Sequence, residues 1–263
     1  MKIRVLGSHG SDLVVNESTG RRICRSVGFL VNDELMIDAG TLASDLTLEE
    51  QKRIKHIFLS HTHLDHIKGL PPLVDNLVGL GSHKVVVASL SSILDGLKRH
   101  IFNDIVFPNF FNMHGQAHSI LVAQPLESQK EISVSGGISI LPVPVNHTVE
   151  TVGFLIRDSH SAWLYSGDTY ITEEIWKIAA QTPNLKGVFI EVSFPNDMMD
   201  IAVWSKHLTP SLLAKEFKKI GKPDIPLYVY HMKPTVRDRI IQELATLEIP
   251  NLTILQEGHE IEL

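Results

Sequence analysis

The sequence contains 263 residues, and its net charge of −6 argues against a nucleic-acid surface, because phosphate backbones are bound by clustered lysine and arginine. Its single cysteine excludes an intramolecular disulfide and suits a reducing compartment. No apolar run approaches the roughly 20 residues of a membrane span, and residues 1–10 lack a signal-peptide core, so we expect a cytoplasmic protein.

Apolar runs and turn residues divide the chain into short strands and helices. The predicted strands are residues 2–6, 27–31, 35–37, 57–60, 84–88, 138–145, 152–156, 162–165, 187–191, 227–230 and, as the last strand, 252–255. The predicted helices are residues 48–55, 73–80, 91–102, 173–180, 210–220 and 237–247. We expect Ser91 or Ser92 and Thr209 to be N-caps, and Pro71 and Pro72 to interrupt the chain before residue 73.

Strands and helices alternate through both halves of the chain, without a Pro/Gly/Ser-rich linker or a short repeat. This order predicts a single α/β domain over residues 1–263, with two β-sheets between helices. The pattern is weakest over residues 103–131. There the apolar residues 107–113 are expected either to cover a site or to form a loop that packs on the surface of the domain.

Four candidate metal ligands follow the strand at 57–60. They lie within six residues, in the sequence HTHLDH: His61, His63, Asp65 and His66. One tetrahedral ion does not readily use all four and keep a position open for water, whereas two adjacent ions do. The stretch therefore predicts part of a two-metal site.

Three further candidate ligands stand at other predicted strand ends: His147, Asp168 and His231. Sites of α/β enzymes are assembled from such strand ends. Imidazole and carboxylate ligands suit Zn, Mn or Fe. One ion would take His61, His63 and His147, and the other Asp65, His66 and His231. Asp168 would bridge them, because one carboxylate spans ions roughly 3.5–4 Å apart.

The sequence HTHLDH, the later NH and GDT, and the late histidine resemble the metallo-β-lactamase superfamily, specifically its phosphodiesterase branch. The resemblance implies an αββα sandwich with a dinuclear metal site at one edge of the two sheets. Redox di-iron relatives usually place a glutamate within the first motif, where this chain has His63.

Three later segments resemble the class II cyclic-nucleotide phosphodiesterases: EVSFPN from residue 191, HLTP from residue 207 and YHMKP from residue 230. The resemblance implies cleavage of the 3′,5′-cyclic phosphodiester of cAMP, and often cGMP, in a homodimer. Residues 107–113 are one candidate dimer contact. Pro71 and Pro72 depart from the family's aliphatic pattern and leave the nucleotide preference open.

The expected mechanism uses a hydroxide bridging the two ions, which attacks phosphorus in line with the O3′ leaving group. Asp65 would orient this hydroxide while acting as a ligand. His207 is the candidate acid that protonates the leaving group, with Glu191 holding its imidazole; the alternative is a histidine that only precedes the next helix.

Other functions remain open on the same frame. The chain also resembles tRNA 3′-processing endonucleases, which carry a glutamate and a late histidine at positions matching Glu191 and His207. The net charge and the segment 101–145, where Lys130 is the only lysine or arginine, argue against RNA and favour a small anionic nucleotide. A thioester- or lactone-cleaving hydrolase and a non-catalytic binding protein are further alternatives.

Overall fold

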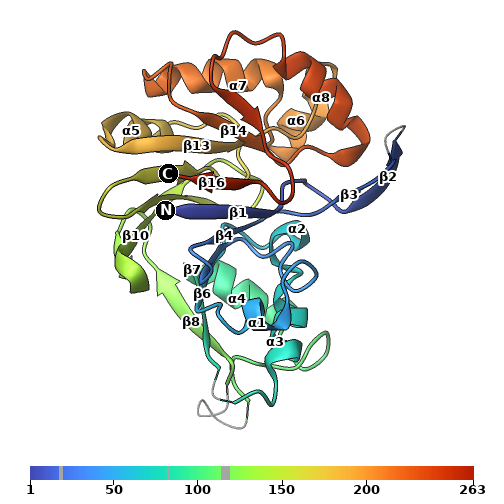
Figure 1. Cartoon of the computed structure of the whole chain (residues 1–263), viewed down its shortest axis with the longest axis vertical. Coiled ribbons are helices and arrows are strands. Elements are labelled where there is room, and N and C mark those ends of the chain that lie inside the picture. The colour runs from blue at the N-terminus through green and yellow to red at the C-terminus, as the bar shows by residue number, and fades with distance from the viewer. Residues whose placement is uncertain (18–19, 82, 114–118) are drawn as a thin grey trace.

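The computed structural model describes residues 1–17, 20–81, 83–113 and 119–263. Within these ranges the chain forms two seven-stranded sheets and helices that lie on the outer sides of the sheets (Figure 1). This architecture confirms the expected αββα sandwich. Among the described residues, no helix has the length and apolar character needed to cross a bilayer.

The first sheet has the order β16-β1-β4-β5-β6-β7-β8, antiparallel from β16 to β5 and parallel from β5 to β8. Its strands are β1 (Lys2–Gly7), β4 (Gly28–Val31), β5 (Leu35–Ile37), β6 (His56–Phe58), β7 (Val85–Leu90), β8 (Leu121–Leu126) and β16 (Glu260–Glu262). A separate hairpin pairs β2 (Leu13–Glu17) with β3 (Gly20–Cys24) and projects beyond the sheets in Figure 1.

The second sheet has the order β15-β14-β13-β12-β11-β10-β9, antiparallel from β9 to β12 and parallel from β12 to β15. Its strands are β9 (Ile132–Val134), β10 (Ile138–Pro144), β11 (Val152–Arg157), β12 (Ala162–Tyr165), β13 (Leu185–Glu191), β14 (Leu227–Tyr230) and β15 (Leu252–Ile254). Each sheet thus has a parallel half, whose strand ends lead into loops that carry polar residues.

Helices α1 to α4 lie beside the first sheet and α5 to α8 beside the second (Figure 1). Their bounds are α1 (Leu48–Gln51), α2 (Leu64–Ile67), α3 (Leu70–Leu77), α4 (Ser91–His100), α5 (Glu174–Gln181), α6 (Met199–Ser205), α7 (Pro210–Phe217) and α8 (Arg237–Leu244). Single 3₁₀ turns are η2 (Ser135–Gly137), η3 (Asn196–Met198), η4 (Lys218–Ile220) and η5 (Pro234–Val236).

An aromatic cluster joins the two sheets. Phe29 of β4 meets three rings of the second sheet edge-on, at centroid distances of 5.6 Å to Tyr165, 5.4 Å to Phe189 and 5.5 Å to Tyr230. All four side chains are fully buried. Such edge-on pairs add about 0.5–1.5 kcal/mol each beyond the burial of apolar area, so this core fixes one sheet against the other.

Every expected strand is present, with ends that shift by up to two residues, but several elements were not predicted. The unpredicted elements are the β2–β3 hairpin, β8, β9, α6 and β16, so residues 252–255 are not the last strand. The hairpin carries its large apolar side chains, such as Val14 at 46% exposure, in solvent, and therefore lacks the pattern of a half-buried strand.

Two predictions about helix starts were wrong. Pro71 and Pro72 do not interrupt the chain but open α3, because the first turn of a helix does not need their missing amide hydrogens. Neither Ser91 nor Ser92 caps α4, since its N-cap is Leu90 and no side chain caps it. Thr209 does cap α7, accepting a hydrogen bond from the Leu212 amide at 3.4 Å.

The apolar segment 107–113 turns its rings toward the core. Phe110 is 3% exposed, and Phe102 meets Phe107 and Phe111 edge-on at 6.0 and 5.4 Å. In this region the exposed apolar side chains are instead those of Ile105 and Val106, which come just before residues 107–113.

Candidate metal centre

Four strand ends bring all seven expected ligands together between the sheets. His61 and His63 follow β6, and Asp65 and His66 lie in the short helix α2. The other three follow strands of the second sheet: His147 after β10, Asp168 after β12 and His231 directly after β14. Because the sheets face each other, ends that are up to 170 positions apart in the chain meet at one edge.

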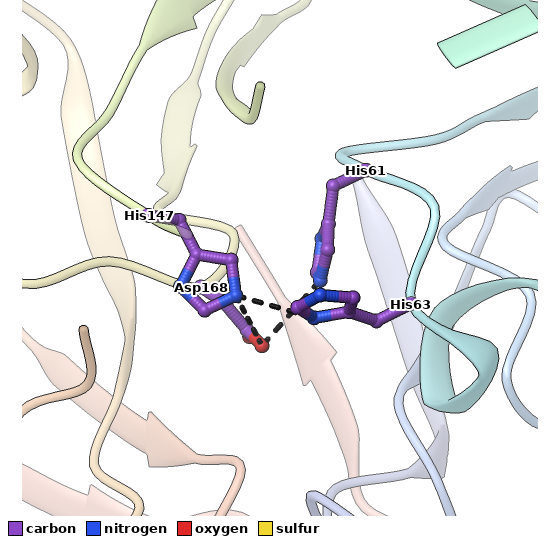
Figure 2. Close-up of side chains that lie close together, drawn as sticks. All are labelled: His61, His63, His147 and Asp168. Carbon is purple, nitrogen blue, oxygen red and sulfur yellow. Dashed lines mark hydrogen bonds and ion pairs between the residues drawn. The ribbon is translucent and has the colours of Figure 1, made fainter. Parts of the chain in front are cut away.

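The first group of ligand atoms belongs to His61, His63, His147 and Asp168, whose side chains point toward one another in Figure 2. These atoms all lie within 4.8 Å of one another. The Oδ2 atom of Asp168 is 3.6 Å from Nε2 of His61 and 3.9 Å from Nε2 of His147. Nε2 of His147 is 3.2 Å from Nδ1 of His63.

The second group consists of Asp65, His66 and His231. Nε2 of His231 lies 3.3 Å from Oδ2 of Asp65 and 3.2 Å from Nε2 of His66. Asp168 stands between the two groups, since its Oδ1 is 3.3 Å from Nε2 of His66 and its Oδ2 is 3.2 Å from Nε2 of His231. Its two oxygens are therefore within reach of both groups.

Divalent cations fit this donor set. Nε2 of His61 and Oδ1 of Asp168 are buried and have no hydrogen-bond partner among the described residues. A buried polar atom without a partner costs roughly 1–3 kcal/mol, and coordination would remove that cost. Imidazole nitrogens and carboxylate oxygens are ligands for Zn, Mn and Fe alike.

The protonation states of three candidate ligand histidines also favour metal binding, whereas the Asp168 and Asp38 carboxylates raise the pKa of His66. Burial lowers the pKa of His61 well below its ordinary value, and burial lowers the pKa values of His147 and His231 to about 4. These imidazoles are therefore neutral near pH 7 and offer a lone pair. Burial alone would raise the pKa of Asp168, but His231 and His66 outweigh it and hold this pKa well below its ordinary value.

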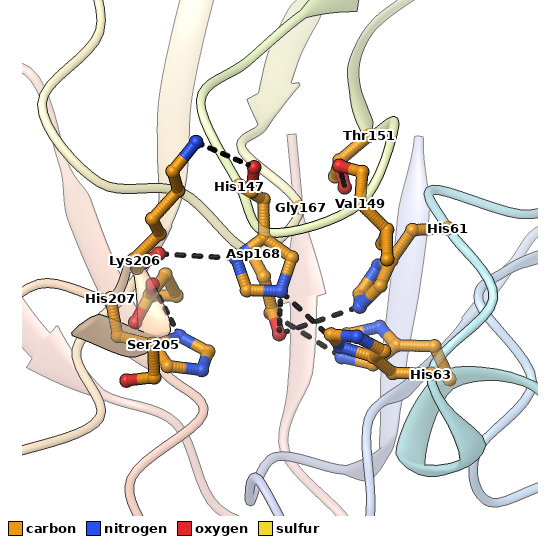
Figure 3. A network of polar contacts seen from close by, with 12 residues as sticks. His61, His63, His147, Val149, Thr151, Gly167, Asp168, Ser205, Lys206 and His207 are labelled. Carbon is orange, nitrogen blue, oxygen red and sulfur yellow. Dashed lines mark hydrogen bonds and ion pairs between the residues drawn. The ribbon is translucent and has the colours of Figure 1, made fainter. Parts of the chain in front are cut away.

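Outer contacts fix which nitrogen three of the candidate ligand histidines turn toward the centre. Nδ1 of His147 donates to the Lys206 carbonyl at 3.1 Å, as Figure 3 shows. Nδ1 of His61 lies 2.9 Å from Oγ of Ser60, and Nδ1 of His231 lies 2.8 Å from Oγ of Ser193. With Nδ1 engaged, Nε2 of these three rings is left for an ion.

Asp38 is the partner of His66, and sequence reasoning missed it. Its buried carboxylate accepts hydrogen bonds from Nδ1 of His66 at 2.7 Å, from the amide and hydroxyl of Ser60 at 2.7 Å each, and from the Tyr165 hydroxyl. Asp38 directly follows β5 and has a φ of 54°. The sequence does place an aspartate in the turn after a buried strand. Nothing in that turn identifies His66 as the partner of this aspartate.

His231 is held in an unusual backbone conformation. Its φ is 72°, which costs a residue with a side chain of order 1–3 kcal/mol. The His231 amide donates to the Ser8 carbonyl at 2.6 Å, which anchors this turn to the loop after β1. Gly10 of that loop has no room for a side chain, because a Cβ there would lie 2.8 Å from the His231 ring. The loop thus packs against a candidate ligand.

Glu191 and His207, the other two expected site residues, lie beside the cluster. Nδ1 of His207 donates to Oε1 of Glu191 at 2.8 Å. The His207 ring stacks on the His231 ring at a centroid distance of 5.2 Å, and its centroid is 5.0 Å from that of the His147 ring. Figure 3 shows His207 beside His147. Burial alone would lower the pKa of His207, but the Glu191 carboxylate outweighs it and raises this pKa. All nine expected site residues are therefore in one place.

A family model described as class-II cAMP phosphodiesterases matches residues 43–249. A Yersinia pestis protein named a probable 3′,5′-cyclic-nucleotide phosphodiesterase is 31% identical over 229 residues, which cover 74% of this chain. The match spans 63% of the length of that relative.

Solved structures share the fold. Unliganded yeast PDE1 superposes with a TM-score of 0.81 at 20% identity, covering 100% of this chain and 99% of that one. The short form of human tRNase Z gives a TM-score of 0.68 at 16% identity, with coverage of 100% and 99%. At these identities the likeness concerns the metallo-β-lactamase fold alone.

Proposed function

The chain belongs to the class-II cAMP phosphodiesterase family, and we propose that it hydrolyses the 3′,5′-cyclic phosphodiester of cAMP to the 5′-nucleotide, with cGMP as a second candidate substrate. The observation that carries this proposal is the His207–Glu191 pair, which stands against a cluster of seven metal-type ligands. A small anionic nucleotide is the proposed substrate class.

Two divalent ions, of Zn, Mn or Fe, are the proposed cofactors. One ion would be held by His61, His63 and His147, and the other by Asp65, His66 and His231. Asp168 would contact both ions. When bound, such a pair supplies a water-derived nucleophile near neutral pH and neutralises charge on the phosphoryl oxygens. The close approaches between imidazole nitrogens, 3.2 Å in both groups, support shared coordination within each group.

His207 is the proposed acid for the O3′ leaving group. Its Nδ1 proton is engaged by Glu191, so its Nε2 is the atom left to face substrate. The raised pKa favours the protonated imidazole, which the departing alkoxide requires. Glu191 would act as a positioning residue, because its carboxylate also accepts from Ser193, whose hydroxyl contacts His231.

The test is hydrolysis by the metal-loaded protein of cAMP, cGMP, bis(p-nitrophenyl) phosphate, a tRNA precursor and a thioester. We expect both cyclic nucleotides, or cAMP alone, to be the best substrates. If the protein cleaves bis(p-nitrophenyl) phosphate but neither cyclic nucleotide, the proposed cyclic-nucleotide activity is refuted, while the protein is still a phosphodiesterase. Preferential cleavage of the tRNA precursor or the thioester would refute the proposed function.

We further propose that residues 1–263 act as one domain and that the protein is a homodimer. The shared aromatic core around Phe29 supports the first point, and an exposed apolar pair supports the second. Ile105 and Val106, at 88% and 62% exposure, are the candidate dimer contact in place of residues 107–113. Sedimentation equilibrium of the wild type and of Ile105→Ser tests this, and a monomeric wild type would refute it.

A further inference from the structure

Lys206 has a backbone conformation that residues with a side chain rarely adopt. It directly follows α6 with a φ of 54° and a ψ of 53°, in the left-handed region. The helix ends in a Schellman motif, in which the Lys206 amide donates to the Val203 carbonyl at 3.3 Å and the His207 amide to the Ala202 carbonyl at 2.9 Å. Glycine is the usual residue at this position, because a Cβ disfavours the conformation.

The Lys206 side chain makes a contact that glycine does not offer. Its Nζ donates to the backbone carbonyl of the candidate ligand His147 at 3.0 Å, while the Lys206 carbonyl accepts from Nδ1 of His147 at 3.1 Å (Figure 3). Two residues that are 59 positions apart are thus joined by two hydrogen bonds of opposite direction. The first of these bonds needs a side chain, and it occurs together with a backbone conformation that disfavours one.

The bond holds the loop that carries His147. This loop, residues 145–151, connects β10 to β11. It is tied to the segment after β12, because the Tyr170 amide donates to the Asn146 carbonyl at 2.7 Å. Lys206 adds a tie to a further segment, the end of α6. The position of His147 therefore depends on α6 as well as on the second sheet.

The same helix end carries the proposed acid. His207 directly follows Lys206, and its ring centroid is 5.0 Å from that of His147. The side chain of His207 is held by Glu191, to which its Nδ1 donates at 2.8 Å, and its backbone is held by the turn at Lys206. Since Lys206 bonds to His147 in both directions, a change in this turn alters the positions of the ligand and the acid together.

We infer that Lys206 is a positioning residue, whose side chain holds the loop of His147 against the helix end that carries His207. It thereby keeps a candidate ligand of one ion in place relative to the proposed acid. This inference rests on the proposed function, and it gives the unpredicted helix α6 a part in the site.

Two substitutions separate the side-chain bond from the backbone strain. Lys206→Gly removes the bond and relieves the strain, whereas Lys206→Met removes the bond and retains a Cβ in the left-handed conformation. We expect both metal-loaded variants to lose about tenfold in kcat for cAMP, with KM changed less than threefold. Competition with a chromogenic chelator should show metal affinity about tenfold weaker in both. These values are at the lower end for supporting contacts, because Nδ1 of His147 keeps its bond to the carbonyl of residue 206.

Thermal unfolding distinguishes the two variants. Lys206→Gly should unfold about 2–4 °C or more above Lys206→Met, because glycine has no Cβ to disfavour the turn. Equal losses of activity in two variants of different stability would trace the effect to the missing donor. Lys206→Arg keeps a donor on a long side chain and should restore kcat and metal affinity to within about threefold of the wild type.

Two control variants match the two changes outside the candidate metal centre. Gln129→Gly relieves a φ of 60° in the exposed turn between β8 and β9. Lys222→Met removes a lysine whose Nζ donates to the carbonyls of Ala179 and Thr182 at 2.9 and 2.7 Å. Both should keep the kcat and the metal affinity of the wild type.

Wild-type kcat and metal affinity in Lys206→Gly would overturn the inference, because Lys206 would then be a helix cap that glycine replaces. Lys206→Arg as impaired as Lys206→Met would also overturn it. If the protein hydrolyses no cyclic nucleotide, but Lys206→Gly and Lys206→Met both bind metal more weakly, the proposed function is refuted and the inference is supported. Hydrolysis of cAMP with unchanged kcat and metal affinity in both variants would have the opposite meaning.

Discussion

Glu191 accepts a hydrogen bond from Nδ1 of His207 at 2.8 Å, and its carboxylate is completely buried. The same carboxylate accepts from the Ser193 hydroxyl at 2.9 Å and from the amides of Thr169 and Leu208 at 3.2 and 3.3 Å. Four donors therefore fix this side chain, and it in turn fixes the ring that stacks on His231.

Replacement of His207 tests the proposed acid. We expect His207→Ala to keep its metal content and to lose about 10²- to 10⁴-fold in kcat, because general acid catalysis contributes on this scale. Metal analysis by mass spectrometry and steady-state kinetics with cAMP measure the two effects. His160→Ala, at an exposed histidine, should match the wild type. Full activity in His207→Ala would contradict the assignment.

Glu191→Gln tests whether this carboxylate positions the acid. The amide offers one acceptor oxygen and presents two hydrogens to surroundings that supply only donors, so the His207 ring loses its fixed orientation. We expect kcat to fall about 10- to 100-fold, as for other supporting carboxylates, with KM changed less than threefold. A variant with raised KM and unchanged kcat would show that Glu191 acts on binding instead.

Asp38→Asn tests the support of His66. The loss of its charge should weaken metal binding about 10- to 100-fold, because Asp38 holds Nδ1 of this candidate ligand. Competition with a chromogenic chelator measures the affinity. Asp33→Asn is a matched control, since Asp33 is exposed and shares the positive φ, 60° against 54° for Asp38. Equal affinities in the two variants would exclude the supporting role.

Asp168→Ala tests the two-ion arrangement. The carboxylate lies within 4 Å of ligand nitrogens from both groups, so its removal should reduce the bound metal from two ions per chain to one at most. Metal analysis after gel filtration gives the stoichiometry, and Asp75→Ala on the exposed side of α3 should retain both ions. Two ions retained by Asp168→Ala would refute the shared carboxylate.

A buried pair in the loop that packs against His231 predicts a pH dependence of stability. Nδ1 of His9, a residue that is 1% exposed, lies 2.7 Å from Oε1 of Glu257. Burial alone would lower the pKa of His9, but the neighbouring Cys24 sulfur and the Glu257 carboxylate outweigh it and raise the pKa to about 9. An unfolded histidine titrates near 6.5, so the stabilisation is complete below about pH 6.5 and is lost as pH rises through about 9.

This difference in pKa corresponds to about 3 kcal/mol. We expect the stability gap between the metal-loaded wild type and His9→Gln, from urea unfolding, to narrow by about that amount between about pH 6 and pH 10. Glu257→Gln should remove the same dependence, whereas His160→Gln should not. A gap that stays constant over this range would contradict the charged pair.

Some of these contacts could not be predicted from the sequence, for a physical reason. Asp38 and Ser193 occur singly, in segments without a ligand motif, and their role arises only when His66 and His231 are brought to them. In the sequence, Gly10 likewise resembles an ordinary loop glycine, although in the structure it faces the His231 ring. Contacts between residues far apart in the chain leave no periodic signal in either segment.

The candidate ligand types could be predicted from the sequence, because the spacing in HTHLDH and the polar residues at later strand ends follow from local strand-to-loop transitions. The sequence also determined the αββα class through its alternating elements and its family motifs. The sequence could not show which strand ends meet or which nitrogen His61, His66, His147 and His231 present. Those properties depend on the facing of two sheets across one core, where burial and hydrogen bonding act between distant segments.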